Sequence, residues 1–139
     1  MRKKINNNKR ITLSLILLLL IFPLIISIYS FLVIYESVKA NCLKAQKEYQ
    51  VDCVDALIKL VQSESKTVRE KNLAIWSLGQ LADEKALPLL YELNQSLPEQ
   101  ERCVYGSYLC KYEIQKAIKW CETGNVTNWM YKNRSNWHY

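Results

Sequence analysis

The residues of this chain best suited to chemistry are five cysteines and one histidine. The cysteines are Cys42, Cys53, Cys103, Cys110 and Cys121, and the histidine is His138, next to the last residue. A serine or cysteine nucleophile needs a base held beside it, and a base at position 138 would rest on a chain end that frays. Neither Cys-x-x-Cys nor His-Glu-x-x-His occurs, so the spacing of a zinc site is missing. The sequence therefore predicts no catalytic residue, no metal site and no cofactor.

The acidic residues and glycines give no sign of an active site either. Glu99 and Glu101 stand beside Arg102 in a polar stretch, where we expect a solvated loop rather than an acid–base pair. The whole chain has 3 glycines, too few for a glycine-rich phosphate loop. We therefore expect a protein that is not an enzyme and has no small-molecule substrate.

The cysteines are better suited to disulfides. Cys103 and Cys110 bracket the segment VYGSYL and could close it as a loop, and Cys42 and Cys53 flank a junction between two expected helices. Cys121 falls on an apolar helical face, where a buried thiol is the simplest expectation. Other pairings stay open, because spacing does not fix connectivity, and the odd count leaves one thiol free or available to another chain.

The element that decides where these cysteines lie is an uncharged run of 25 residues, from Ile11 to Tyr35. As a helix it would be about 37 Å long, enough to cross a hydrocarbon core of roughly 30 Å. We expect residues 11–35 to span a lipid bilayer. Five cations and no acid precede the run, which predicts a cytoplasmic N-terminus, with the rest of the chain periplasmic or extracellular, where disulfides persist. These cations are Arg2, Lys3, Lys4, Lys9 and Arg10.

The basic tail also explains the net charge of +6. The other 14 Lys and Arg residues follow residue 35 and nearly balance the 13 acids. A nucleic-acid interface needs its cations on the folded surface, so we expect no nucleic-acid partner. One alternative to a permanent anchor is a signal peptide cleaved after Ala40, because Val38-Lys39-Ala40 has small residues at the required positions. The apolar run is longer than a usual signal core, which favours the anchor.

Helical periodicity dominates the chain beyond the span. Residues 36–50 contain neither Gly nor Pro and predict a juxtamembrane helix. Apolar residues then recur at helical spacing in four segments, with Asp52 as a cap for the first and Gly79 as a close-packing point in the second. The last three predicted helices run over 68–82, 84–95 and 112–122. No segment alternates like a strand, so we expect an all-α domain of antiparallel helix pairs.

Three short motifs in this domain carry a family resemblance. They are Val68-Arg69, Leu78-Gly79-Gln80-Leu81 and the segment DEKALPLL at 83–90. On these motifs, residues 55–93 resemble a HEAT-type repeat in its short bacterial form. The resemblance implies an α-solenoid-like fold, a protein-binding role and a bacterial plasma membrane. Two features depart from the pattern: Ser63 or Ser65 replaces the acidic turn residue, and the second pair lacks a Val-Arg start.

A single repeat and a half cannot bury its own faces, so this domain needs disulfides, a cap or a partner. Residues 123–139 supply aromatic side chains, and we expect them to cap the open end of the last helix pair, with a docking patch or a membrane-interface contact as alternatives. The expected organisation is a basic tail at 1–10, a span at 11–35, a juxtamembrane helix at 36–50, a HEAT-like domain at 51–122 with an irregular loop at 96–111, and an aromatic tail at 123–139.

The sequence thus predicts a single-pass membrane protein that binds an unidentified protein partner. The surface residues expected to make that contact are large or cationic side chains of the repeat and the tail. They are Arg69, Lys71, Trp76, Trp129 and Trp137. The alternative is a secreted helical protein stapled by disulfides and released after Ala40.

Overall fold

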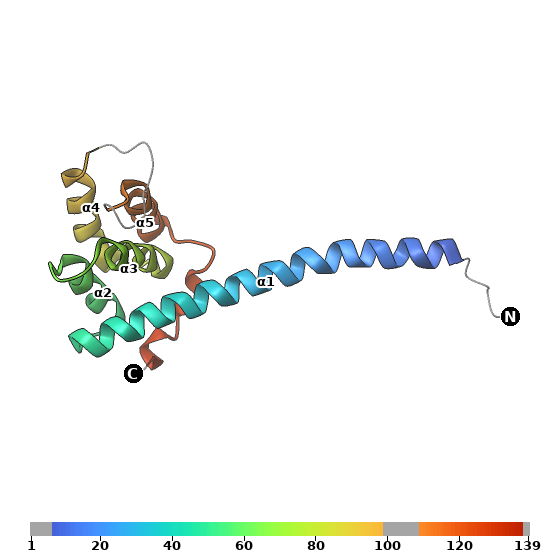
Figure 1. Ribbon diagram of the computed structural model, residues 1–139, viewed down its shortest axis with the longest axis horizontal. Helices are drawn as coiled ribbons and strands as arrows, with labels where there is room; N and C mark the ends of the chain where they lie inside the picture. The colour runs from blue at the N-terminus through green and yellow to red at the C-terminus, as the bar shows by residue number, and fades with distance from the viewer. Residues whose placement is uncertain (1–6, 99–108, 138–139) are drawn as a thin grey trace. The chain divides into compact units, whose positions relative to one another are not determined.

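The computed structural model describes residues 7–98 and 109–137, and the chain divides into two compact units between Ile34 and Tyr35. The described residues form helices and no strand, which confirms the all-helical prediction for that part of the chain (Figure 1). The α-helices are α1 (Asn7–Tyr49), α2 (Cys53–Gln62), α3 (Val68–Leu81), α4 (Leu87–Ser96) and α5 (Lys111–Thr123). Three short 3-10 helices complete the set: η1 (Glu84–Ala86), η2 (Asn128–Tyr131) and η3 (Arg134–Asn136).

The first unit is the apolar part of α1. Among the described residues, α1 is the one helix long and apolar enough to cross a membrane. Pro23 lies inside it without ending it. The polar side chains near the proline turn back onto the backbone: the hydroxyls of Ser27 and Ser30 donate to the carbonyl oxygens of Pro23 and Ile26, each at 2.9 Å. Hydroxyls bonded in this way suit an apolar surrounding, because neither hydroxyl is left without a partner.

The second unit begins with the last turns of α1. Its helix starts follow from local capping. Asp52 accepts a hydrogen bond from the Asp55 amide at 2.8 Å and caps α2, as the sequence predicts. Thr67 and Glu70 form a reciprocal capping box at the start of α3. The predicted boundary between span and juxtamembrane helix has no counterpart in the backbone, because both stretches belong to α1.

The helix expected over 84–95 is divided in the structure. Asp83 caps the 3-10 turn η1 by accepting from the Lys85 amide at 3.0 Å, and α4 begins only at Leu87. Pro88 explains the division, since a residue without an amide hydrogen is accommodated in the first turn of a helix and not in its interior. The difference moves the start of the helix by three residues and keeps its apolar face.

The core of the second unit gathers side chains from α1 through α5. Val38, Cys42 and Ala45 of α1 are fully buried beside Leu57 and Ile75. Helix α3 packs against both α2 and α5, and α4 packs against α5 (Figure 1). The central contact depends on Gly79, where an added Cβ would lie 2.9 Å from the Ala117 Cα atom. The glycine thus provides the close packing between α3 and α5 that the sequence predicts.

The structure places Cys42 and Cys53 together as a disulfide, which ties α1 to the first turn of α2. Cys110 is also disulfide-bonded, and Cys103, its expected partner, lies outside the described residues. Cys121 is a free, buried thiol whose Sγ atom lies 3.8 Å from the Leu78 carbonyl oxygen. Burial raises the pKa of this thiol to about 11, so it stays protonated at neutral pH and is a poor nucleophile.

The C-terminal tail covers a different surface from the one expected. It does not simply cap the last helix pair. Asn125 donates to the carbonyl oxygens of Gly79 and Gln80 at 2.9 and 3.0 Å, at the end of α3. The tail then reaches α1, where the rings of Tyr131 and Trp137 pack against Tyr35. The physical reason is that the exposed carbonyls at the end of α3 and the ring of Tyr35 both need partners.

Candidate functional site

A hollow in the folded unit lies between the last turns of α1 and α3. We call it the α1–α3 groove. Its volume is about 570 Å³, and it is lined by Ser37, Ala40 and Asn41 of α1 and by Asn72, Leu73 and Trp76 of α3. Neither a cation nor a carboxylate lines it, so its floor is made of apolar and neutral polar side chains. A hollow of this composition suits an apolar side chain of a partner better than an ionic ligand.

The two faces of α3 explain why the groove is apolar. Ala74, Ile75 and Leu78 are buried in the core between the helices. Leu73 falls on another face and remains 43% exposed, although it is a large apolar residue. Trp76 follows three positions later and is half-buried. Helical spacing therefore places both side chains on one stripe that faces the groove.

Polar groups at the groove already have protein partners. Asn41 donates to the Ser77 hydroxyl at 2.9 Å, and that hydroxyl donates to the Leu73 carbonyl oxygen at 2.8 Å. The side-chain oxygen of Asn72 accepts from the Cys110 amide at 3.0 Å. These bonds fix the polar rim, so an incoming group gains more from apolar contact with Leu73 and Trp76 than from new hydrogen bonds.

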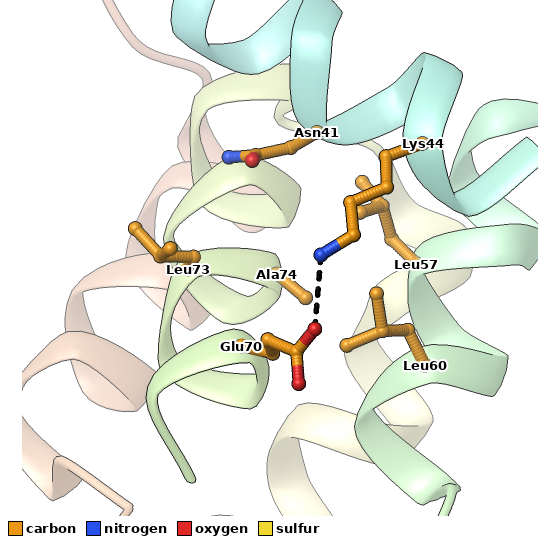
Figure 2. A pocket seen from close by; sticks show the side chains of 7 residues that line it. All are labelled: Asn41, Lys44, Leu57, Leu60, Glu70, Leu73 and Ala74. Carbon is orange, nitrogen blue, oxygen red and sulfur yellow. Dashed lines mark hydrogen bonds and ion pairs between the residues drawn. The ribbon is translucent and has the colours of Figure 1, made fainter. Parts of the chain in front are cut away.

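A smaller pocket of about 30 Å³ adjoins the groove and shares Asn41 and Leu73 with it (Figure 2). Its volume would hold about one water molecule. Leu57 and Leu60 of α2 form one wall of this pocket, and the Lys44 ammonium group reaches across it to the Glu70 carboxylate, with Nζ 2.9 Å from Oε1 (Figure 2). The ion pair therefore closes this end of the hollow.

Glu70 is the group whose ionisation matters most at the pocket. The hydrogen bond from Lys44 and those from the Thr67 amide and hydroxyl lower the pKa of Glu70 from its usual 4.5 to about 2. A carboxyl whose pKa is lowered by folding stabilises the fold above its unfolded pKa and loses that contribution as the pH falls. The acid form of Glu70 would also lose both its role in the capping box and its pairing with Lys44.

We expect the stability of the second unit to fall as the pH drops from about 5 to about 2, and Glu70 to account for part of that fall. Urea midpoints at several pH values would measure it by tryptophan fluorescence, since all 4 tryptophans lie beyond residue 75. Glu70→Gln should lower the midpoint at neutral pH and flatten its acid dependence. Glu64→Gln, at an exposed turn position, is the control. An unchanged acid limb in Glu70→Gln would contradict the assignment.

The structure separates the five predicted surface residues. Trp76 lines the groove, and Arg69, which is exposed, lies one turn before Leu73 on the same stripe of α3. Lys71 is half-buried on α3. Trp129 is exposed and belongs to the tail, far from α3 in the sequence. Trp137 is buried against Tyr35 and Tyr131, which leaves little of its surface for a partner.

Sequence reasoning missed five of the six residues that line the groove: Ser37, Ala40, Asn41, Asn72 and Leu73. Leu73 had a usable signal, because a leucine outside the buried stripe of Ala74, Ile75 and Leu78 is left facing outward. Ala40 had none, since its role depends on α1 packing beside α3. The irregular loop expected at 96–111 lies mostly outside the described residues, including Glu99, Glu101 and Arg102. His138 lies outside them as well.

The side chains that line the α1–α3 groove are suited to binding. Within residues 7–98 and 109–137, no three His, Cys, Asp or Glu side chains come close enough to hold a metal ion. The groove offers apolar contact and fixed polar groups, and the protonated Cys121 thiol lies in the core. No protein-family description, curated protein or solved structure matches this chain, so the residues themselves carry the functional argument.

Proposed function

We propose that this chain is a single-pass membrane protein whose C-terminal unit binds another protein through the α1–α3 groove. The observation that carries the proposal is the outward stripe of α3, where Leu73 is 43% exposed beside the half-buried Trp76. Tryptophan is one of the residues enriched among the sites of strong binding energy at protein interfaces. A folded unit of about a hundred residues, held at a bilayer, would present this groove at a fixed place.

The partner that best fits the groove is a peptide segment with an apolar side chain followed by an acid about one helical turn away. The apolar side chain would lie on Leu73 and Trp76. Arg69, exposed one turn earlier on α3, would pair with the acid. The hydrogen-bonded polar side chains at the rim of the groove would exclude water from the apolar contact and help to orient the peptide.

The arrangement of helices supports a HEAT-like role. Helices α2 and α3 form one packed pair, α4 and α5 form the next, and α3 packs against α5 across the two. In repeats of this kind, equivalent helices of successive pairs stack, and the exposed helix faces bind proteins. We propose that this unit is a shortened HEAT-like array in which the last turns of α1 cover the open face before α2.

The proposed topology has the N-terminus in the cytoplasm and the folded unit outside a bacterial plasma membrane. The cations before Ile11 and the uncharged run of 25 residues support it. Two disulfide-bonded sites in the folded unit, at Cys42–Cys53 and Cys110, suit an oxidising compartment. The proposal therefore joins a bilayer contact through residues 11–35 to a protein contact through the groove.

The alternative, release after Ala40, fits the packing less well. Cleavage there would remove Val38, which is fully buried, and Tyr35, which packs against Tyr131 and Trp137. The bond after Ala40 also lies within α1, and proteases prefer extended, accessible backbone. Mass spectrometry of the native protein distinguishes the two, since a soluble form beginning at Asn41 would contradict the anchor.

The binding proposal can be tested by photo-crosslinking in native membranes. A photoreactive amino acid at Leu73 should yield adducts of discrete mass with one protein. The same amino acid at Tyr112, exposed on α5, is the matched control. Trp76→Ala should weaken binding of the captured partner by about 2 kcal/mol, or roughly thirtyfold. Equal labelling at both positions, or undiminished binding by Trp76→Ala, would remove the groove as the site.

A further inference from the structure

The end of the apolar run indicates how deep Tyr35, the first residue of the folded unit, lies in the membrane. Tyr35 is the last residue of the uncharged run and Glu36 is the first charge after it. In a membrane-spanning helix such a tyrosine lies at the headgroup layer, where its ring and hydroxyl are both accommodated. The inference that follows rests on the proposed anchor, and it concerns which other residues must lie at this depth.

The C-terminal tail is packed on that tyrosine. The Tyr131 ring stacks on the Tyr35 ring with centroids 6.1 Å apart, and the Trp137 ring meets it edge-on at 5.8 Å. Tyr131 and Trp137 also pack against each other at 6.2 Å. The Lys39 ammonium group lies 5.9 Å from the centre of the Tyr35 ring. A tail held to Tyr35 in this way must lie at the membrane surface whenever α1 spans the bilayer.

Other tail side chains point away from the folded unit. Trp129 is 63% exposed and Val126 is 78% exposed, although both are large and apolar. One residue separates Trp129 from Tyr131, so the Trp129 backbone lies within about 7 Å of the Tyr131 backbone. The headgroup layer of one leaflet is roughly 5–8 Å thick, so the indole can reach it.

The charge of the tail fits the same surface. Glu122 is the last acidic residue of the chain, and Lys132 and Arg134 follow it. Arg134 is paired with Asp83, whereas Lys132 is exposed. A tryptophan three residues before a lysine, in a tail whose own sequence has no acid, matches the composition of interfacial anchors facing lipid phosphates.

We propose that the tail, residues 125–137, is a second membrane contact that inserts Trp129 and Val126 into the phospholipid headgroup layer beside the exit of α1. The buried Tyr131 and Trp137 attach the tail to Tyr35, and the outward residues contact lipid. The contact holds the folded unit close to the bilayer and restricts its rotation about α1. It also assigns the exposed tail tryptophan to lipid rather than to a protein partner.

Fluorescence quenching by brominated lipid tests the proposal on the full chain in phospholipid vesicles. One variant keeps Trp129 as its only tryptophan, with Trp76, Trp120 and Trp137 changed to Phe. The control has its only tryptophan at position 64, through Glu64→Trp. That turn lies near Glu48, which binds Lys66 at 2.6 Å and is about 20 Å further along α1 than Tyr35. We expect bromines near the headgroups to quench Trp129 and to leave the tryptophan at position 64 unchanged.

A second measurement avoids the multiple substitutions. Trp129→Phe in the otherwise unaltered chain should reduce the share of fluorescence that brominated lipid quenches. Every variant is also floated with its vesicles after an alkaline wash. Flotation with equal quenching at positions 129 and 64 overturns the tail contact alone, including the case in which the tail binds a protein. Loss of flotation overturns the anchor and the tail contact together.

Discussion

Replacing Gly79 with valine is expected to destabilise the folded unit by roughly 2–3 kcal/mol, the upper end of the range for overpacked cores. An added Cβ would lie 2.9 Å from the Cα atom of Ala117 and 3.0 Å from its Cβ atom. Because one of these atoms is backbone, α5 would have to move as a whole rather than adjust a side chain. Urea unfolding followed by tryptophan fluorescence would measure the change in the full chain in detergent.

Alanine at position 79 separates packing from helix propensity. On propensity alone, Gly79→Ala would stabilise α3 by about 1 kcal/mol. We expect a net loss, because the same Cβ meets Ala117. Ala117→Gly removes one of the two close atoms, so the double variant should be more stable than the sum of the two single changes predicts. A stabilised Gly79→Ala protein would contradict the close contact between α3 and α5.

Removing the Cys42–Cys53 disulfide is expected to cost roughly 3 kcal/mol, because the bond closes a loop of about a dozen residues in the unfolded chain. The sequence separation of the two cysteines is 11, and both side chains are buried. The loop joins the last turns of α1 to α2, and we expect its loss to lower the free energy of unfolding of the whole folded unit. The double variant Cys42→Ala, Cys53→Ala, unfolded in urea, measures it.

The control uses the other disulfide-bonded cysteine. Reductant should destabilise the unaltered chain through both Cys42–Cys53 and Cys110. In the double variant, reductant should cause only the part of the destabilisation that depends on Cys110. Cys121→Ala, which alters a free buried thiol, should leave the response to reductant unchanged. An equal response of the double variant and the unaltered chain would show that the first disulfide contributes nothing to stability.

Local features of the fold were predictable because their causes lie within a few residues. The caps at Asp52 and Thr67 and the end of α5 at Gly124 come from side chains and backbone at the helix ends. The division of the helix expected at 84–95 was missed, although Pro88 carried the signal. The error was one of boundary: the helix was expected to begin at residue 84, and α4 begins at Leu87, which places Pro88 in its first turn.

Little of the candidate site was predictable from the sequence. Trp76 was predicted as a surface residue from its type, and it lines the groove. Trp137 was predicted in the same way and is buried, because a tryptophan near a chain end looks the same in sequence whether it covers a core or awaits a partner. Leu73 follows from helical phase once the buried face of α3 is known. Ala40 becomes part of the groove only through its neighbour in space.

The cysteines show how far sequence reaches toward function. By itself it determined their number, the uncharged run before them and the lack of a base beside them, which together favoured structural roles over catalysis. Residue counts and the composition of a segment do not depend on tertiary contacts, so the sequence alone gives them. The apolar helix and the all-helical class follow from the same local periodicity.

Tertiary structure decided the rest. It placed Cys42 beside Cys53, brought α1 over α3 to form the groove, and attached the tail to Tyr35. Each outcome brings together residues from different helices or from the tail. Each therefore depends on how the helices pack against one another. Periodicity states that a face is apolar, whereas only the packed chain determines what covers that face.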